Sequence, residues 1–458
     1  MRGIVLAGTA SGVGKTTVVS GLVAALRSLG LQVAPFKVGP DYIDPTYHAK
    51  AAGRPCHNLD SWMLPHDVLR DLFARATVGT DIAIVEGVMG LFDGRAGGGE
   101  AGSTAEVAKL LGLPVVLVVD AAKAARSVGA LVLGFQRFDP DLRMAGVILN
   151  NVASASHAAM CREAIAAATG LPVFGALRRD EALRAPERHL GLVPTVEGVL
   201  ADGYFEAVTA SVATQVDLPA LLEYAEADVP ATPWVAPAGL WPEGQPSRRV
   251  AIAVAQDEAF SFVYPENLAL LEGWGAEIIP FSPLRDTRIP DGAAGIILGG
   301  GFPELYAGTL AENRPMLDSI RDAARRGVVT YGECGGLMYL AESLTDLDGR
   351  VHALAGVVPL RSSMSRTRLT LGYRTASARA DGPHVERGQT VRGHEFHWST
   401  LDAPVAPEAA AYHLAEGDVL DGYARDNVWA SYVHLHFASD PRLAPRFVAT
   451  CSRILEGE

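Results

Sequence analysis

The sequence predicts an α/β protein with two doubly wound domains, and three observations support this fold class. In the first half, short buried strands alternate with helices, which is typical of a mostly parallel sheet covered on both faces. Residues 224–247 are rich in proline, alanine, glycine and tryptophan, a composition that interrupts both helix and sheet. A second α/β alternation begins with a strand at Arg249. We therefore expect a domain over 1–223, a linker over 224–247 and a second, different domain over 248–458.

The individual elements follow from the hydrophobic pattern. Runs rich in Val, Ile and Leu predict buried strands, and the longer mixed stretches between them predict helices. In the first half we expect a helix at about 18–29 and strands at 3–7, 33–38, 82–86, 115–120 and 145–149. In the second half we expect a helix over 337–344, a strand that starts at Gly295, and strands at 249–254, 328–330 and 430–437.

Composition excludes several classes of protein. The formal net charge of -13 argues against a nucleic-acid partner, because such binding needs a basic face. The four cysteines are scattered without the spacing of a disulfide scaffold or a metal site, as in proteins of a reducing compartment. No apolar run reaches the roughly 18 residues that span a bilayer, and a strand begins where a signal peptide would otherwise stand. We therefore expect a cytoplasmic enzyme with no membrane partner.

Cys334 lies in a tight connection between a predicted strand and a predicted helix. The run Gly332-Glu-Cys-Gly-Gly336 permits the backbone angles of a strand-to-helix elbow, which presents the central side chain at the end of the strand. A thiol at a helix N-terminus is expected to ionise more easily, because the amide dipoles favour the thiolate. The alternative is a small core cysteine beside a glycine turn. The elbow favours a nucleophile, provided that a base lies nearby.

A glycine-rich loop joins the first strand to the first helix. Its sequence is Gly8-Thr-Ala-Ser-Gly-Val-Gly-Lys-Thr-Thr17, with the first glycine one position earlier than the strict phosphate-loop pattern has it. Backbone amides of such a loop can point at phosphates, and its lysine can reach the β- and γ-oxygens. The alternative is a chance glycine turn, but the strand–loop–helix order favours ATP binding. The candidate ATP-binding residues here are Gly12, Gly14, Lys15, Thr16 and Thr17.

Acidic side chains follow two of the predicted strands. Asp41 comes after the second strand and Glu86 ends the third. Ligands of open α/β sheets bind at the carboxyl ends of the strands, so both carboxylates fall on the side of the phosphate loop. Mg²⁺ needs one or two carboxylates plus phosphate oxygens, and the Thr16 hydroxyl can add a further ligand. We therefore expect Mg²⁺ at Thr16, Asp41 and Glu86, and the alternative for Asp41 is a turn cap before Pro45.

Four further side chains near these strand ends are candidates for substrate contact. Lys37 ends the second strand and could neutralise an acidic substrate, although a solvated strand-end lysine is the alternative. Asp44 follows it closely and could instead cap the turn before Pro45. Tyr42 and Asp93 lie in the loops that follow the second and third strands, and we expect both to contact or order the substrate.

The first half resembles the dethiobiotin synthetase-like ATPases, which activate a carboxylate by phosphoryl transfer. The loop form Gly-Thr-x-x-x-Val-Gly-Lys-Thr is shared with that group, and so is Gly146-Val-Ile-Leu-Asn150. The resemblance implies that Asn150 contacts the adenine. Residues 39–47 and 86–94 are similar to those of the corrinoid branch, the cobyrinic acid or hydrogenobyrinic acid a,c-diamide synthases. This implies a synthetase domain that acts on carboxylates of a corrin ring.

The second half resembles a class I-type glutamine amidotransferase domain of the cobyric acid synthase branch. The likeness lies in Gly295-Ile-Ile-Leu-Gly-Gly-Gly-Phe-Pro-Glu-Leu-Tyr306, in the elbow around Cys334, and in Ala430-Ser-Tyr-Val-His-Leu-His-Phe437. The resemblance implies a glutaminase in which Cys334 attacks glutamine and releases ammonia. Amides near Gly300 and at Gly335 would stabilise the oxyanion.

Two histidines compete for the role of general base. A single strand would place His434 and His436 on the same face, so the alternation of side chains does not choose between them. The family pattern Tyr-x-His-x-x-Phe aligns with Tyr432, His434 and Phe437, which selects His434. His436 stands where ordinary glutaminase triads have a glutamate, so the third member of the triad is open and His436 can equally be a core histidine. His394 and His397 would line the glutamine pocket or a domain interface.

These resemblances imply ATP- and glutamine-dependent amidation of the a and c acetate carboxylates of a corrin ring, through an acyl phosphate. The expected small-molecule partners are ATP, glutamine and the corrinoid, with ATP and Mg²⁺ as cofactors and a homodimer as the commonest closed assembly. The residues leave open whether the ring carries cobalt. Alternatives are an amidotransferase for another carboxylate, a ParA-like ATPase switch, or a second domain that only docks. An ATPase switch has a lysine early in the loop, where this chain has Ala10.

Overall fold

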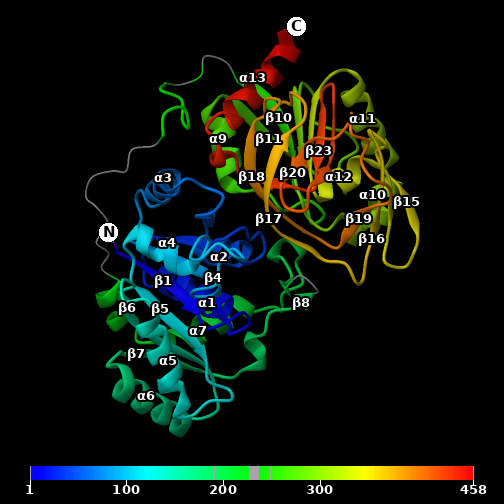
Figure 1. Ribbon diagram of the computed structural model, residues 1–458. Coiled ribbons are helices and arrows are strands. Elements are labelled where there is room, and N and C mark those ends of the chain that lie inside the picture. The colour runs from blue at the N-terminus through cyan, green and yellow to red at the C-terminus, as the bar shows by residue number, and fades with distance from the viewer. Residues whose placement is uncertain (1, 189–190, 226–236, 245, 247–248, 457–458) are drawn as a thin grey trace. The chain divides into compact units, whose positions relative to one another are not determined.

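A computed structural model describes residues 2–188, 191–225, 237–244, 246 and 249–456 (Figure 1). The chain forms two compact units, 1–235 and 236–458, and each contains a parallel sheet flanked by helices. The predicted two-domain α/β fold is therefore confirmed. The division falls inside the stretch 224–247, for which the sequence predicts a linker. Much of that stretch lies outside the described residues, so the bounds of the linker stay a prediction.

The first unit is built on a seven-stranded parallel sheet of order β3-β2-β4-β1-β5-β6-β7. Its strands are β1 (Arg2–Gly8), β2 (Val33–Val38), β3 (His57–Leu59), β4 (Ile82–Gly90), β5 (Val115–Asp120), β6 (Met144–Val152) and β7 (Val173–Arg178). The five strands expected from the sequence are all present. The short β3 and the edge strand β7 were not anticipated. A small hairpin of β8 (Glu187–Arg188) and β9 (Gly191–Leu192) follows.

Helices cover both faces of this sheet. They are α1 (Lys15–Ser28), α2 (Asp44–Ala52), α3 (His66–Ala76), α4 (Thr104–Leu111), α5 (Ser127–Phe138), α6 (Ala155–Thr169), α7 (Tyr204–Gln215) and α8 (Leu218–Tyr224), with single 3₁₀ turns at Glu181–Leu183 and Thr195–Glu197. α1 packs against α7, and fully buried residues such as Leu22 and Ile84 form the core beneath them. Because all strands are parallel, the loops after β1, β2, β4 and β6 meet at one edge of the sheet.

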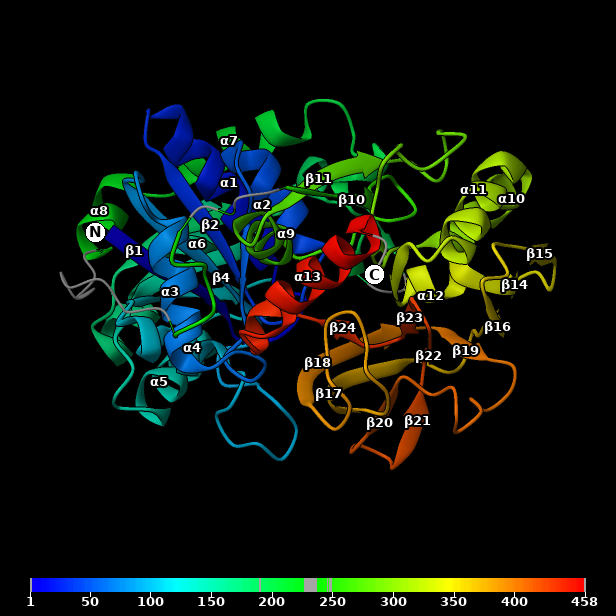
Figure 2. The ribbon, with the colours of Figure 1, turned by 90° about the horizontal axis from the view of Figure 1, so that it is seen from above.

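The second unit contains three sheets rather than one. A six-stranded sheet of order β11-β10-β12-β13-β23-β22 is parallel except for its last pair. It consists of β10 (Val250–Ala255), β11 (Ala276–Phe281), β12 (Gly295–Leu298), β13 (Val329–Glu333), β22 (Tyr423–Arg425) and β23 (Val428–Ser431). A four-stranded sheet contains β14 (Ala341–Thr345), β15 (Val351–Ala353), β16 (Val358–Met364) and β19 (Ser399–Leu401). A five-stranded antiparallel sheet contains β17 (Thr370–Ala378), β18 (Thr390–His397), β20 (Tyr412–Leu414), β21 (Val419–Asp421) and β24 (His434–Leu435), as Figure 2 shows.

The helices of the second unit are α9 (Pro265–Gly273), α10 (Ala307–Glu312), α11 (Arg314–Arg325), α12 (Gly335–Leu340) and α13 (Leu443–Glu456), with 3₁₀ turns at Pro303–Tyr306 and Phe437–Ser439. The predicted helix over 337–344 is wrong in its second half. The chain becomes extended at Ala341, whose ψ is 167°, and continues as β14 because that strand pairs with both β15 and β16. In the part of the chain that the structure describes, no helix is both long and apolar enough to cross a bilayer.

The predicted late strand over 430–437 is also wrong. β23 ends at Ser431 in the six-stranded sheet, and β24 begins at His434 in the five-stranded sheet. A bend at Tyr432 separates them, and Asp421 Oδ2 holds the chain there by accepting hydrogen bonds from Ser431 Oγ and from the Tyr432 amide. Simple alternation along one strand therefore does not describe how His434 and His436 are placed.

Candidate active sites

The glycine-rich loop of the first unit connects β1 to α1. Gly12 and Gly14 have φ angles of 76° and 85°, the left-handed region that glycine adopts without strain. The Lys15 ammonium is almost fully buried and donates a 2.7 Å hydrogen bond to Met89 O. Burial lowers the pKa of Lys15, and the nearby Glu86 carboxylate opposes that effect. A buried cation beside left-handed glycines is the arrangement that phosphate binding requires.

Asn150 and Thr17 contact this loop region differently. Asn150, in β6, donates from Nδ2 to Val13 O at 2.9 Å, and a Cβ added at Gly14 would collide with the same amide group. The structure therefore brings Asn150 to the loop, and its contact with adenine stays a prediction. The Thr17 side chain is hydrogen-bonded to Tyr204 of α7, and its predicted contact with ATP stays a prediction.

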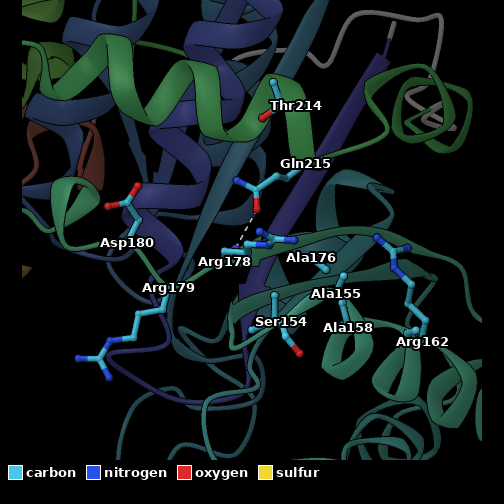
Figure 3. A pocket seen from close by; sticks show the side chains of 12 residues that line it. Ser154, Ala155, Ala158, Arg162, Ala176, Arg178, Arg179, Asp180, Thr214 and Gln215 are labelled. Carbon is cyan, nitrogen blue, oxygen red and sulfur yellow. Dashed lines mark hydrogen bonds between the residues drawn. The ribbon is translucent and has the colours of Figure 1, made fainter.

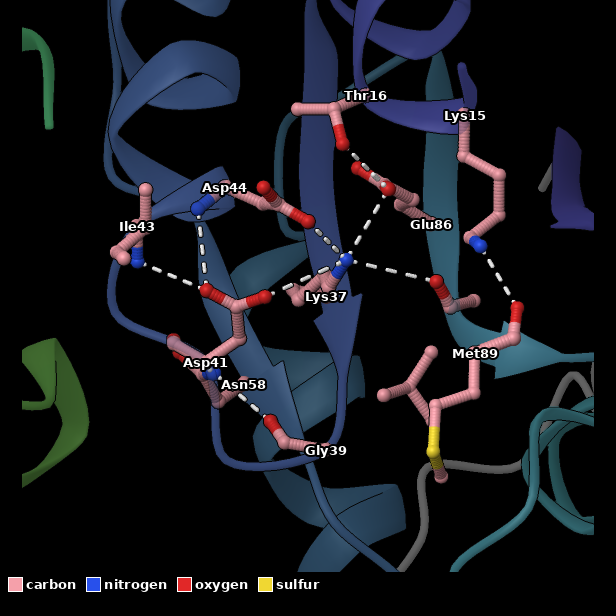
Figure 4. A network of polar contacts seen from close by, with 12 residues as sticks. Lys15, Thr16, Lys37, Gly39, Asp41, Ile43, Asp44, Asn58, Glu86 and Met89 are labelled. Carbon is pink, nitrogen blue, oxygen red and sulfur yellow. Dashed lines mark hydrogen bonds and ion pairs between the residues drawn. The ribbon is translucent and has the colours of Figure 1, made fainter. Parts of the chain in front are cut away.

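Glu86 of β4 is the centre of a buried polar network (Figure 4). Its Oε1 accepts hydrogen bonds from Thr16 Oγ1 and Lys37 Nζ, each at 3.0 Å. Its Oε2 contacts His48 Nε2. Burial alone would raise the pKa of this carboxyl, but Lys37 and His48 lower it well below its usual range. Glu86 is therefore a charged, paired carboxylate directly beside the phosphate loop.

Lys37 joins Glu86 to the carboxylates that follow β2. Its Nζ lies 2.5 Å from Asp44 Oδ2 and 3.5 Å from Asp41 Oδ2. Burial alone would lower the pKa of Lys37, but Asp44 and Glu86 raise it well above its usual value. Because Lys37 is buried, the alternative of a solvated strand-end lysine does not apply. Its ammonium instead holds three carboxylates together at the edge of the sheet.

Asp41 caps the turn before Pro45, which was the alternative for this residue, and its predicted part in binding Mg²⁺ stays a prediction. Its Oδ1 accepts the backbone amides of Ile43 at 2.8 Å and Asp44 at 3.1 Å, which caps the turn, while its Oδ2 faces Lys37. Asn58 of β3 supports the same loop, because its Nδ2 donates to Gly39 O and Asp41 O. The turn therefore aims the Asp41 carboxylate at the network.

Asp93 and Tyr42 lie outside the network itself. Asp93 Oδ2 accepts the amide of Gly90 at 2.9 Å, which closes the loop after β4. Tyr42 is half-buried in the loop after β2. Their predicted contacts with substrate stay predictions, whereas Asp44 and Lys37 meet directly.

A cavity of about 630 Å³ opens at the same edge of the first unit (Figure 3). It starts at Val152, two residues beyond Asn150 in β6, and continues past the end of β7, the start of α6 and the end of α7. Arg178 N donates to Gln215 Oε1 at 2.9 Å across its wall. The polar side chains that line it are Ser154, Arg162, Arg178, Arg179, Asp180, Thr214 and Gln215.

Cys334 forms the predicted elbow between β13 and α12. Its φ of 49° and ψ of −100° are strained for a residue with a Cβ, and such strain is typical of functional turns. Gly336 is required there, because a Cβ at that position would collide with Leu298 O at the end of β12. Burial, followed by the Glu304 carboxylate, raises the pKa of the Cys334 thiol well above its usual value. The expectation of an easily ionised thiol is therefore wrong: α12 is short, and burial outweighs the amide of Gly335.

The glycine turn after β12 brings the other candidate residues together. A Cβ at Gly335 would stand 3.2 Å from Gly301 N, so the amides after Cys334 and after Gly300 adjoin. A Cβ at Gly300 would collide with His434 Cε1 and stand 3.3 Å from His434 Nε2. The cysteine elbow and His434 thus lie on either side of one glycine turn. This arrangement suits Cys334 as the nucleophile, the glycine turn as the oxyanion site and His434 as the base.

Replacing Gly300 by alanine is expected to reduce glutamine hydrolysis by about ten- to a hundredfold, because the new methyl group displaces the His434 ring and small misplacements are costly. The measurement is glutamate release at saturating glutamine. Gly308→Ala is the matched control, since its Cβ would meet only His352 Cε1 at 4.0 Å. Equal rates of glutamine hydrolysis in both variants would show that the position of the His434 ring does not matter for the reaction.

Two protein families match the chain. The CobQ/CobB/MinD/ParA nucleotide binding domain matches residues 4–193, and the CobB/CobQ-like glutamine amidotransferase domain matches residues 251–442. The cobyrinate a,c-diamide synthase of Syntrophotalea carbinolica is 47% identical over 454 residues, which cover 98% of each chain. The chain belongs to the a,c-diamide synthase family. The hydrogenobyrinate a,c-diamide synthase of Streptomyces coelicolor is 44% identical and covers 98% of this chain, with 97% of its own length matched. The cobyrinate a,c-diamide synthase of Salmonella typhimurium is 43% identical, with 98% of each chain covered.

Membership of the a,c-diamide synthase family accounts for both units. A ParA-like ATPase switch would explain only the first of them. The relatives carry the names of both cobyrinate and hydrogenobyrinate enzymes, so family membership by itself does not choose between cobalt-containing and metal-free rings.

The three other histidines that the sequence singles out in the second unit of this a,c-diamide synthase family member have distinct surroundings. His436 is fully buried, accepts the Ala438 amide at Nδ1, and lies with Nε2 3.7 Å from Glu266 Oε2, so it is a core histidine that caps a 3₁₀ turn. The His394 ring stacks on His434 with centroids 4.9 Å apart. His397 stacks on Tyr432 and contacts Ser399 O. Within the described residues, no group of three or more His, Cys, Asp or Glu side chains could hold a metal ion.

Sequence reasoning missed three residues of the two sites. His48 backs Glu86 and also contacts Ser20 Oγ through Nδ1 at 3.1 Å. Asn58 supports the Asp41 turn, and Glu333 lies 3.5 Å from His434 Nδ1. One signal was available for Glu333, because a carboxylate at the end of a buried strand rarely lacks a partner.

Proposed function

We propose that this chain uses glutamine and ATP to amidate the a and c acetate carboxylates of cobyrinate or hydrogenobyrinate in cobalamin biosynthesis. One observation carries the proposal: a single chain combines a strained cysteine elbow with a buried phosphate-loop lysine, over nearly the whole length of relatives with that name. The first feature suits release of ammonia from glutamine. The second suits activation of a carboxylate that would otherwise be a poor acyl donor.

In the glutaminase half-reaction, Cys334 Sγ would attack the side-chain amide carbon of glutamine. The thiol proton would pass to His434, and then to the departing ammonia, as the carbon–nitrogen bond breaks. The amides of Gly301 and Gly335 would stabilise the oxyanion, because the amide of Gly300 itself donates to Phe262 O at 3.1 Å. Water would then release glutamate from the thioester, with His434 again as the base. A thiol of raised pKa makes this base necessary rather than optional.

In the synthetase half-reaction, an acetate oxygen of the corrin ring would attack the γ-phosphorus of ATP, and ADP would leave. Ammonia would then attack the acyl carbon and displace phosphate, which leaves a carboxamide. Phosphoryl transfer depends mainly on position and charge neutralisation, which Lys15 and the loop amides would supply. Lys37 would neutralise and order the carboxylates of Asp44 and Glu86 beside the substrate, and Tyr42 and Asp93 would contact the corrin ring from the neighbouring loops.

The donor atoms beside the loop fit Mg²⁺. Thr16 Oγ1 and Glu86 Oε1 adjoin at 3.0 Å, and Mg²⁺ prefers a few protein oxygens combined with phosphate oxygens. Thr16, Glu86 and Asp41 would hold the ion, and Asp41 would use Oδ2, since its Oδ1 accepts two backbone amides. When bound with ATP, Mg²⁺ supplies positive charge to the phosphates.

The cavity at the ends of β6 and β7 would take the nucleoside part of ATP. Its volume of about 630 Å³ lies within the range of small-molecule pockets, and it starts two residues beyond Asn150, which contacts the phosphate loop. This position of the cavity is compatible with the contact between Asn150 and the adenine that the family resemblance implies.

The test is amidation of each corrinoid in parallel with MgATP and glutamine, followed by mass spectrometry of the ring. We expect the a,c-diamide from one or both substrates, with one glutamate and one ADP formed per amide. Glutamate and ADP production without amidation of either ring would point to another carboxylate as the substrate.

We further propose a cytoplasmic homodimer. The four cysteines are all free and buried, which supports a reducing compartment. The exposed side chains of Leu131 and Phe138 in α5 support an interface between two copies of the chain, because burial of large apolar side chains is favourable. Sedimentation equilibrium of the full chain measures the oligomeric state directly.

A further inference from the structure

Glu333, the residue before Cys334, brings a carboxylate to the candidate base of the second unit. Its Oε2 lies 3.5 Å from His434 Nδ1, within the range of an ion pair. The two residues come from different sheets, since Glu333 ends β13 and His434 begins β24. The ordinary position for a triad carboxylate, two residues after the histidine, is occupied by His436.

Glu333 is held by two hydrogen bonds to its other oxygen. Tyr331 Oη donates to Oε1 at 2.6 Å, and the Leu435 amide donates to the same atom at 3.1 Å. The carboxylate is buried, and burial of a charge is costly unless partners compensate for it. With Oε1 engaged in this way, Oε2 is directed at the imidazole.

The His434 ring is held in the orientation that a general base needs. His394 stacks on one face with an interplanar angle of 18°, and Gly300 allows the ring edge with Cε1 and Nε2 to approach the glycine turn. Nδ1 therefore faces Glu333, while Nε2 faces the turn that adjoins the cysteine elbow. A carboxylate at Nδ1, with Nε2 directed toward the side of the cysteine elbow, is the arrangement of a catalytic triad.

We propose that Glu333 is the positioning carboxylate of the glutaminase site and holds His434 with its proton on Nδ1. The inference rests on the proposed function, since it assigns a role within the Cys334 reaction. Nε2 then accepts the proton from Cys334 Sγ as the sulfur–carbon bond forms, and donates it to nitrogen as ammonia leaves. Glu333 stays ionised throughout and stabilises the imidazolium, without touching glutamine.

The decisive variant is Glu333→Gln. The Leu435 amide can only donate, so the glutamine oxygen is retained at the Oε1 position and its NH₂ group faces His434 Nδ1. A donor there favours the tautomer with its proton on Nε2, which cannot act as the base. We expect kcat for glutamine hydrolysis to fall by at least about a hundredfold, with KM changed only a few-fold. Glu333→Asp keeps the charge at a greater distance and should retain more activity than Glu333→Gln.

Three comparisons separate this role from a structural one. Tyr331→Phe removes a bond to the same carboxylate but keeps the charge, so its rate should stay within a few-fold of the unmodified chain. Amidation driven by free ammonia should survive in Glu333→Gln, which shows that the variant is folded. An unchanged glutaminase rate in Glu333→Gln would overturn the inference, and so would a loss confined to Glu266→Gln, the carboxylate beside His436. Absence of glutaminase in the unmodified chain would instead refute the proposed function.

Discussion

Replacing Cys334 by serine is expected to reduce glutamine-driven amidation by at least about a thousandfold, while amidation driven by free ammonia continues. The strained elbow of Cys334 adjoins the glycine turn that also approaches His434. A serine hydroxyl at the same place is far harder to ionise and a weaker nucleophile than a thiolate. The measurement compares corrinoid amidation with glutamine and with ammonium as the nitrogen source.

The matched control for this prediction is Cys451→Ser. Cys451 is a fully buried thiol in α13, and burial raises its pKa to about 12, but it has no elbow and no glycine turn. If loss of a buried thiol alone reduced activity, both variants would behave alike. Loss of ammonia-driven amidation in Cys334→Ser would contradict the division of labour between the two units.

The state of the Cys334 thiol explains why a base is needed in this site. Burial and Glu304 raise its pKa, whereas only the Gly335 amide opposes them. The resting thiol therefore keeps its proton near neutral pH, and the attack on glutamine must be coupled to proton transfer. A protonated resting thiol is also less reactive toward water-borne electrophiles and oxidants.

The sequence predicts much of what depends on local pattern. The strands Val33–Val38 and Val115–Asp120 are found with the expected bounds, because their apolar runs end abruptly at polar or glycine-rich segments. The phosphate loop and the cysteine elbow are recognisable for the same reason, since each needs glycines at fixed positions along the chain.

The sequence does not predict features that depend on contacts between distant segments. Glu333 meets His434 only because β13 and β24 belong to sheets that the chain joins through a bend at Tyr432. Tertiary pairing also converts Ala341–Thr345 from predicted helix to strand. His48 is found beside Glu86 because α2 packs against β2, a contact that no spacing in the chain encodes.

Replacing Lys15 by alanine is expected to reduce amidation by about 10²–10³-fold with either nitrogen source, while glutamine hydrolysis persists. The Lys15 ammonium is hydrogen-bonded to Ala10 O and Met89 O and lies beside the Glu86 carboxylate. Its removal would leave the ATP phosphates without this positive charge. Lys109→Ala is the matched control, because that lysine pairs with Glu100 and Asp139 at the surface, where ion pairs contribute little.

ADP release and corrinoid amidation should fall together in Lys15→Ala, whereas a loss of glutamate release alone would contradict the assignment of Lys15 to the synthetase half-reaction. A fall in both half-reactions would mean that the glutaminase depends on an occupied nucleotide site, and the same variant assayed for glutaminase with and without ATP distinguishes that coupling from misfolding.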